Sequence, residues 1–197
     1  MRKPWQGFLV VGLAALLIAG PLAYSMSRQY HRRNFRVVED GVLYRSGQLS
    51  PDGLAGVMQD YRIKTLVTLR TTRKPELGYP DAWEADVCKA HDIKHIRITP
   101  KVWGPDEDGE IPAEENVRRF LDVVNDPANH PVLVHCMAGI HRTGTLVAVF
   151  RMERQHWPVD RAIDEMEFCG FKPEVMHEHI RHYLTTFRPS WQAGGAH

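Results

Sequence analysis

The sequence predicts an α/β fold, a three-layer sandwich around a central, largely parallel β-sheet. Short apolar segments alternate with longer segments of helical periodicity, which is typical of parallel strands joined by helices. A glycine-containing loop separates one apolar segment from the helical pattern after it, as at the carboxyl edge of an open α/β sheet. The 197 residues, 43% of them hydrophobic, suffice for one domain with its own core and an appendage.

Local signals place the elements of the first half. Asp40-Gly41 is a hairpin turn signal between two short strands. Ser50 and Pro51 are typical of the N-cap and the first position of a helix. The expected elements are strands at residues 35–39 and 42–45, a helix from 51 to about 61, a strand at 65–69, a helix at 81–91 and a strand at 93–98.

The second half begins with a loop at residues 99–111, which contains two prolines and two glycines. The strand that follows is the apolar run just before the glycine-containing loop, and it is expected to be central. The expected elements are helices at residues 112–124, 143–156, 158–168 and 173–187, and the central strand at 132–135.

The loop after the central strand carries the residues most suggestive of chemistry. It reads His-Cys-Met-Ala-Gly-Ile-His-Arg-Thr-Gly over residues 135–144. Backbone N–H groups and a helix N-terminus favour a bound anion there, and the same field favours the thiolate of Cys136. Arg142 can hold two phosphate oxygens, Gly139 allows close approach of the backbone, and Thr143 can donate a hydrogen bond to the sulfur. The pattern predicts a nucleophilic cysteine rather than a buried structural one.

Residues 135–144 resemble the signature of the cysteine-dependent protein tyrosine phosphatase superfamily, with every defining position matched. Residues 44–48, 63–70, 129–136 and 164–165 resemble the small atypical dual-specificity phosphatases of plants and fungi, and the similarity covers roughly residues 35–186. The resemblance implies two-step hydrolysis of phosphate monoesters through a phosphocysteine, without cofactor or metal. The residues it implies as phosphate ligands are Met137, Ala138, Gly139, Ile140, His141 and Arg142. His135 would orient the loop rather than react.

The same resemblance implies a general acid in the loop at residues 99–111. Of its acidic residues we favour Asp106, which follows Trp103-Gly104-Pro105, with Asp108 as the second choice. A solvated acidic loop without a catalytic role is the alternative.

Two residues inside the stretch at 135–144, called the phosphate loop from here on, indicate which substrate to expect. Met137 and Ile140 stand where the plant-and-fungal branch usually has basic residues. Fewer cations favour phosphotyrosine or another monoester over a highly charged inositol pyrophosphate. Arg45, Arg70 and Arg73 could line the cleft, although exposure on the surface is the default for arginine. A phospho-binding module with little catalysis and a rhodanese-like sulfur transferase are the alternative functions.

Composition excludes several other classes. A net charge of +1 lacks the positive excess that is typical of nucleic-acid-binding proteins. Three cysteines do not make a disulfide scaffold. The histidines at 177, 179 and 182 lack further ligands at metal spacing and are expected on a solvated helix face. The expected partners are therefore a phosphorylated protein or a small phosphate ester.

An uncharged apolar run at residues 8–24 precedes the phosphatase-like region. Its length is about the minimum for a membrane span, and an uncleaved anchor is favoured over a cleaved export signal. More arginines follow the run than precede it, which slightly favours a cytoplasmic catalytic domain. The expected organisation is an anchor or signal segment at 1–24, a linker at 25–34, a catalytic domain at 35–187 and a tail at 188–197.

Overall fold

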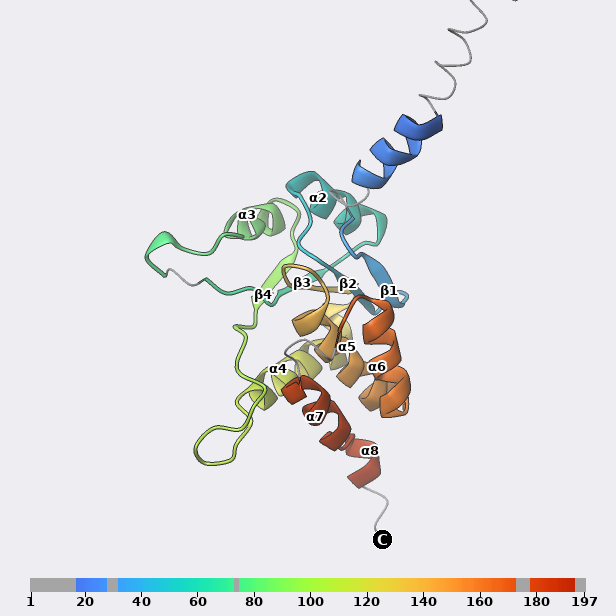
Figure 1. Ribbon diagram of the computed structural model, residues 1–197. Helices are drawn as coiled ribbons and strands as arrows, with labels where there is room; N and C mark the ends of the chain where they lie inside the picture. Colours follow the sequence, from blue (N-terminus) through green and yellow to red (C-terminus); the bar gives the residue numbers. More distant parts are fainter. Residues whose placement is uncertain (1–16, 28–31, 73–74, 173–177, 194–197) are drawn as a thin grey trace, which may run out of the picture.

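The computed structural model describes residues 17–27, 32–72, 75–172 and 178–193. A five-stranded sheet lies between two layers of helices (Figure 1). The strand order is β1-β2-β5-β3-β4, and only β1 and β2 pair antiparallel. The strands are β1 (Arg36–Glu39), β2 (Leu43–Ser46), β3 (Thr65–Thr68), β4 (Lys94–Arg97) and β5 (Val132–His135). The predicted α/β class is confirmed, with a mixed sheet that is parallel apart from this one edge hairpin.

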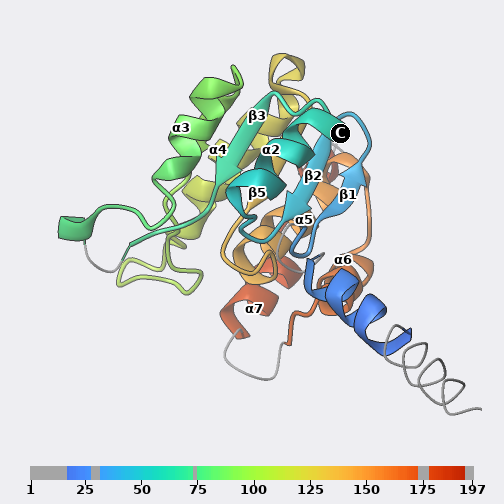
Figure 2. The ribbon, with the colours of Figure 1, turned by 90° about the horizontal axis from the view of Figure 1, so that it is seen from above.

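The helices divide between the two faces of the sheet. Helices α2 and α3 cover one face, and α4 to α8 lie on the other (Figures 1 and 2). Their bounds are α2 (Pro51–Asp60), α3 (Trp83–Ala90), α4 (Ala113–Asn125), α5 (His141–Arg154), α6 (Val159–Phe168), α7 (Glu178–Thr186) and α8 (Ser190–Ala193). Two 3-10 turns are η1 (Pro75–Leu77) and η2 (Pro127–Asn129).

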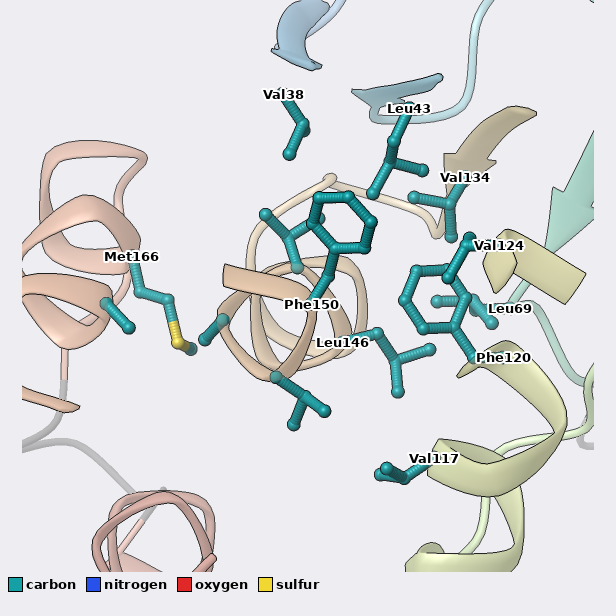
Figure 3. Close-up of a cluster of buried hydrophobic side chains, with 14 of the residues drawn as sticks. Val38, Leu43, Leu69, Val117, Phe120, Val124, Val134, Leu146, Phe150 and Met166 are labelled. Atoms are coloured by element: carbon teal, nitrogen blue, oxygen red, sulfur yellow. The ribbon is translucent and has the colours of Figure 1, made fainter. Parts of the chain in front are cut away.

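The central strands supply both hydrophobic cores because successive side chains of a strand point to opposite faces. In β5, Val132 and Val134 join the core under α4, α5 and α6, while Leu133 joins the core under α2 and α3. Figure 3 shows the larger core, in which Phe150 and Leu146 of α5 lie among residues of the sheet and α4. Helix α5, which directly follows the predicted phosphate loop, is thus fixed by buried contacts along its length.

A local signal accounts for the start of α2. The Ser50 side chain accepts a hydrogen bond from the Gly53 N–H at 3.1 Å, and Pro51 opens α2, as predicted. Helix α3 begins at Trp83, two residues later than expected. Residues 173–177 of the last predicted long helix lie outside the described residues, and α7 is described from Glu178.

The structure describes only part of the predicted apolar N-terminal segment. Residues 17–27 are helical with exposed side chains, and residues 1–16 lie outside the described part. Within the described residues, no helix combines the length and apolar character needed to cross a bilayer.

Cys88 gives the fold a measurable alkaline sensitivity. Burial, with a smaller contribution from the nearby Glu84 carboxylate, raises the pKa of the Cys88 thiol to about 12. The folded chain therefore holds this proton more tightly than the unfolded chain, whose thiol has a pKa of roughly 8.5. The stability that Cys88 contributes is complete below that value and is lost as the pH rises toward 12. Urea unfolding between pH 8 and 11 should show a steeper loss of stability in the wild type than in Cys88→Ala.

Tyr44 and Tyr183 also have a pKa raised by burial, and they add a loss of the same sign. Both tyrosines remain in the variant, so the difference in slope isolates Cys88. Parallel curves for the two proteins would contradict this assignment.

Candidate active site

The predicted phosphate loop connects the end of β5 to the start of α5. Strand β5 ends at His135, α5 begins at His141, and the loop lies at the carboxyl end of the central strand. Gly139 has a φ of +73°, and an added Cβ would lie 2.5 Å from backbone atoms of Ser46 and Gly47. A side chain at residue 139 would therefore push the loop away from the end of β2.

Hydrogen bonds hold the carbonyl groups of the loop on the side that faces away from the Cys136 sulfur. Three consecutive carbonyls accept hydrogen bonds from residues in or next to the β1–β2 hairpin: Met137 from the Gln48 N–H (3.1 Å), Ala138 from the Asn34 side chain (2.7 Å) and Gly139 from the Arg45 side chain (2.7 Å). In a planar trans peptide the N–H points opposite to the carbonyl. The N–H groups of residues 138–140 therefore face the other side, where the Gly139 N–H donates to the Cys136 sulfur at 3.3 Å.

The Cys136 sulfur lies on this amide-lined side of the loop, and Arg142 lies in the first turn of α5, which follows the loop. Cys136 is 5% exposed, and its sulfur is the acceptor already described. The Arg142 guanidinium is half-buried and donates through Nη1 to the Leu69 carbonyl at 3.2 Å, which ties it to the chain that follows β3. Thr143 was expected to donate to the sulfur, but its hydroxyl is buried without a hydrogen-bond partner among the described residues.

A buried polar network supports the loop from the α3 side. His135 Nε2 lies 3.0 Å from the Thr68 hydroxyl and 3.2 Å from a carboxylate oxygen of Glu84. Glu84 also accepts from Thr68 (2.9 Å) and Gln48 (2.8 Å), and His95 lies 2.9 Å from the same hydroxyl. Burial lowers the pKa of His95. The network fixes the His135 ring directly before Cys136 through Nε2. Nδ1 has no hydrogen-bond partner among the described residues, so the orienting role of His135 stays a prediction.

Asp106 lies in the predicted acidic loop, exposed to solvent. Its Oδ1 accepts the N–H groups of Asp108 (3.1 Å) and Glu110 (3.0 Å), so its hydrogen bonds stay within its own loop. The beginning of the same loop lines a pocket together with Arg142. This narrow pocket is lined by Leu69, Ile98, Pro100, Lys101, Trp103, Asn116, Arg142 and Leu146.

The predicted surface position is wrong for one arginine. Arg45 is 2% exposed and lies beneath the loop, because its strand β2 pairs directly with β5. Arg70 is half-buried and donates to the Gln48 side chain, while Arg73 lies outside the described residues. The sequence reasoning missed Asn34, Gln48 and Glu84. No local signal identifies them, because each acts through a partner far along the chain.

Comparison with known proteins agrees with this geometry. Residues 25–181 match the family model described as DSP-PTPase phosphatase fused to NAD+ kinase. The chain is 36% identical over 143 residues to inositol diphosphatase DSP1 of Oryza sativa, covering 72% of this chain and 60% of that protein. It is 31% identical over 149 residues to inositol diphosphatase DSP4 of Arabidopsis thaliana, covering 72% and 67%. The match thus spans less than two thirds of the rice protein.

Solved structures share the fold. The core catalytic domain of the PP-IP phosphatase SIW14 from S. cerevisiae, in complex with citrate, superposes with a TM-score of 0.61 at 25% identity, covering 80% of this chain and 86% of that one. P. aeruginosa TpbA gives a TM-score of 0.57 at 20% identity, covering 79% and 85%, and this likeness concerns the fold alone. From the matched residues, the relatives and the fold together, the chain belongs to the family of DSP-PTPase phosphatases, the group described as fused to NAD+ kinase.

Proposed function

We propose that this protein hydrolyses phosphate monoesters through a phosphocysteine formed on Cys136. One observation carries the proposal: the N–H groups of residues 138–140 face the side of the loop that holds the Cys136 sulfur. An anion placed there meets preorganised donors, which stabilise the charge that develops on transferred phosphoryl oxygens. Arg142, tethered to the Leu69 carbonyl, adds a charged fork at the edge of the same site.

The reaction takes two steps. In the first, the Cys136 thiolate attacks phosphorus, the bond from phosphorus to the ester oxygen breaks, and Asp106 gives its proton to the leaving oxygen. In the second, the Asp106 carboxylate takes a proton from water as the water oxygen attacks phosphorus. The sulfur–phosphorus bond breaks, and the thiolate and inorganic phosphate result.

The uncharged side chains of the loop favour a substrate with few negative charges. Met137 is 51% exposed at the first position after the nucleophile, and Ile140 packs against the core. Neither supplies a cation, which favours phosphotyrosine or another monoester as substrate. Inositol pyrophosphate is the second candidate, because the similar plant proteins are inositol diphosphatases.

A substrate panel separates these functions. Initial rates would be measured with a phosphotyrosine peptide, a phosphoserine peptide and an inositol pyrophosphate, with Cys136→Ser as the blank. Mass spectrometry of acid-quenched wild type should find phosphate on Cys136. A protein that binds phosphate analogues but never forms this adduct would be a binding module. Sulfur transfer from thiosulfate would identify a rhodanese-like enzyme.

Asp106→Asn should slow hydrolysis of phenyl phosphate by roughly a hundredfold, within the range expected for loss of a general acid. The effect on p-nitrophenyl phosphate should be much smaller, because its leaving group needs little protonation. Steady-state rates with both esters test this. Asp108→Asn is the matched control in the same loop. If Asp108→Asn shows the leaving-group dependence and Asp106→Asn does not, Asp108 is the acid.

We also propose that residues 8–24 anchor the protein in a membrane, with the catalytic domain in the cytoplasm. The length of the apolar run supports the anchor, as do the exposed apolar side chains of its described end, Leu17, Ile18 and Leu22. The arginines that follow the run support the cytoplasmic side. Fractionation of cells expressing the full chain should recover it with membranes after carbonate washing. Release by carbonate, or loss of the N-terminus in the mature protein, would contradict an anchor.

A further inference from the structure

Beneath the phosphate loop lies a cation without an obvious counter-charge. The Arg45 side chain is among the largest fully buried side chains of the described residues. Its Nη2 donates to the Gly139 carbonyl at 2.7 Å, while Nε and Nη1 have no hydrogen-bond partner there. None of the ion pairs found in the described part of the chain includes it. A buried guanidinium without a paired charge is unfavourable, so its retention needs a compensating anion.

The charged and ionisable groups around Arg45 limit which anion could compensate its charge. The charged or ionisable groups with the largest electrostatic effect on it are, in descending order, Cys169 at the end of α6, Glu165 of α6, Arg36 of β1 and Cys136 of the loop. Glu165 is already paired with Arg151 at 2.6 Å, and Arg36 is a cation. The remaining groups able to carry an unneutralised negative charge are the two thiols.

Of these two thiols, Cys136 is the one with an anion-stabilising setting. Its sulfur accepts the Gly139 N–H, and Gly139 is the residue whose carbonyl Arg45 holds. The guanidinium also lies against the first turn of α5, since a Cβ on Gly144 would be in ordinary van der Waals contact with Arg45 Nη2 at 3.5 Å. Arg45 therefore lies behind the loop, on the carbonyl side, while the phosphate would bind on the amide side.

We propose that Arg45 is a positioning residue that acts as the second cation of the phosphate site. From the carbonyl side of the loop, its positive charge stabilises the Cys136 thiolate and the bound phosphate. Its hydrogen bond also holds the Gly139 carbonyl on the side away from the phosphate. It does not touch substrate, in contrast to Arg142. This inference deepens the proposed phosphatase function and rests on it.

The test compares Arg45→Gln with Arg45→Lys and with Arg154→Gln. Glutamine keeps a donor and loses the charge, whereas lysine keeps the charge. Arg154→Gln removes the same charge from an exposed arginine in the last turn of α5, the end of that helix away from the loop. Alkylation of Cys136 by iodoacetamide is followed against pH by mass spectrometry. The midpoint should rise by about one pH unit or more in Arg45→Gln, the size expected for losing a nearby cation. In Arg45→Lys most of the shift should be absent.

Binding of inorganic phosphate gives an independent readout in the Cys136→Ser background. Adding Arg45→Gln should weaken it about tenfold or more, since a charged donor behind the site is lost. Arg154→Gln should move neither quantity, because the charge it removes lies at the far end of α5. An unchanged alkylation midpoint in Arg45→Gln would overturn the proposal.

If Arg45→Gln does not fold, the arginine itself can be observed. The ¹⁵N resonance of Arg45 Nε should titrate together with Cys136, and this step should vanish in Cys136→Ser and persist in Cys169→Ser. The reverse pattern would make Cys169 the partner of Arg45 and refute the proposal. None of these readouts needs turnover. An Arg45-dependent midpoint in a protein without phosphatase activity would therefore reject the proposed function and keep the inference.

Discussion

Replacing Cys136 with serine should lower turnover by about four orders of magnitude or more, as loss of the nucleophile does in other covalent enzymes. A serine hydroxyl does not ionise near neutral pH, so the attacking anion is lost. Binding of inorganic phosphate or tungstate should persist within a few-fold, because the donors are backbone N–H groups and Arg142. Steady-state rates and isothermal titration calorimetry measure the two quantities.

Cys88→Ser is the matched control, since Cys88 is buried in the core under α2 and α3, on the opposite face of the sheet from α5. It should cost stability and leave turnover per folded molecule close to that of the wild type. Loss of anion binding together with turnover in Cys136→Ser would contradict the loop geometry described above.

Arg142→Lys should be nearly as damaging as Arg142→Ala, with each lowering kcat/KM by roughly two to three orders of magnitude. Lysine keeps the positive charge but cannot present two parallel donors to a phosphate. It also cannot hold the Leu69 carbonyl and the phosphate at once in the arrangement that the guanidinium adopts. Kinetics of both variants with the same ester test the expectation.

Arg118→Lys is a suitable control, because Arg118 is an exposed α4 residue outside the phosphate loop. Turnover by Arg142→Lys close to that of wild type would show that charge alone is required. In that case the bidentate contact would have no role.

The parts of this molecule that short-range signals determine could be predicted from the sequence. Ser50 and Pro51 start α2 where expected, because a side chain caps an amide three residues away. The loop at 136–140 follows β5 and precedes α5 as the apolar run and the helical pattern indicate. Cys136 and Arg142 could be predicted as nucleophile and phosphate ligand because both lie within one stretch of ten residues, and these two roles stay predictions.

The groups that support this loop could not be predicted in the same way. Arg45 reaches Gly139 across 94 positions, Asn34 reaches Ala138 across 104, and Glu84 reaches His135 across 51. Each contact depends on which strands become neighbours, since β2 and β3 flank β5 only in the folded sheet. Arginine is exposed by default, so the burial of Arg45 follows from that strand order and from no property of its neighbours in sequence.

The hydrogen bonds that residues 33 and 34 make to Gly47 and to the phosphate loop have a practical consequence for expression. The Arg33 carbonyl accepts the Gly47 N–H at 2.7 Å, next to the Asn34 bond to Ala138. A shortened protein starting at Phe35, where the first strand was expected to begin, would omit both contacts. Crystallisation and inhibitor screening should therefore use fragments that start upstream of Arg32, since a shorter fragment would present a phosphate loop with one of its three carbonyl anchors missing.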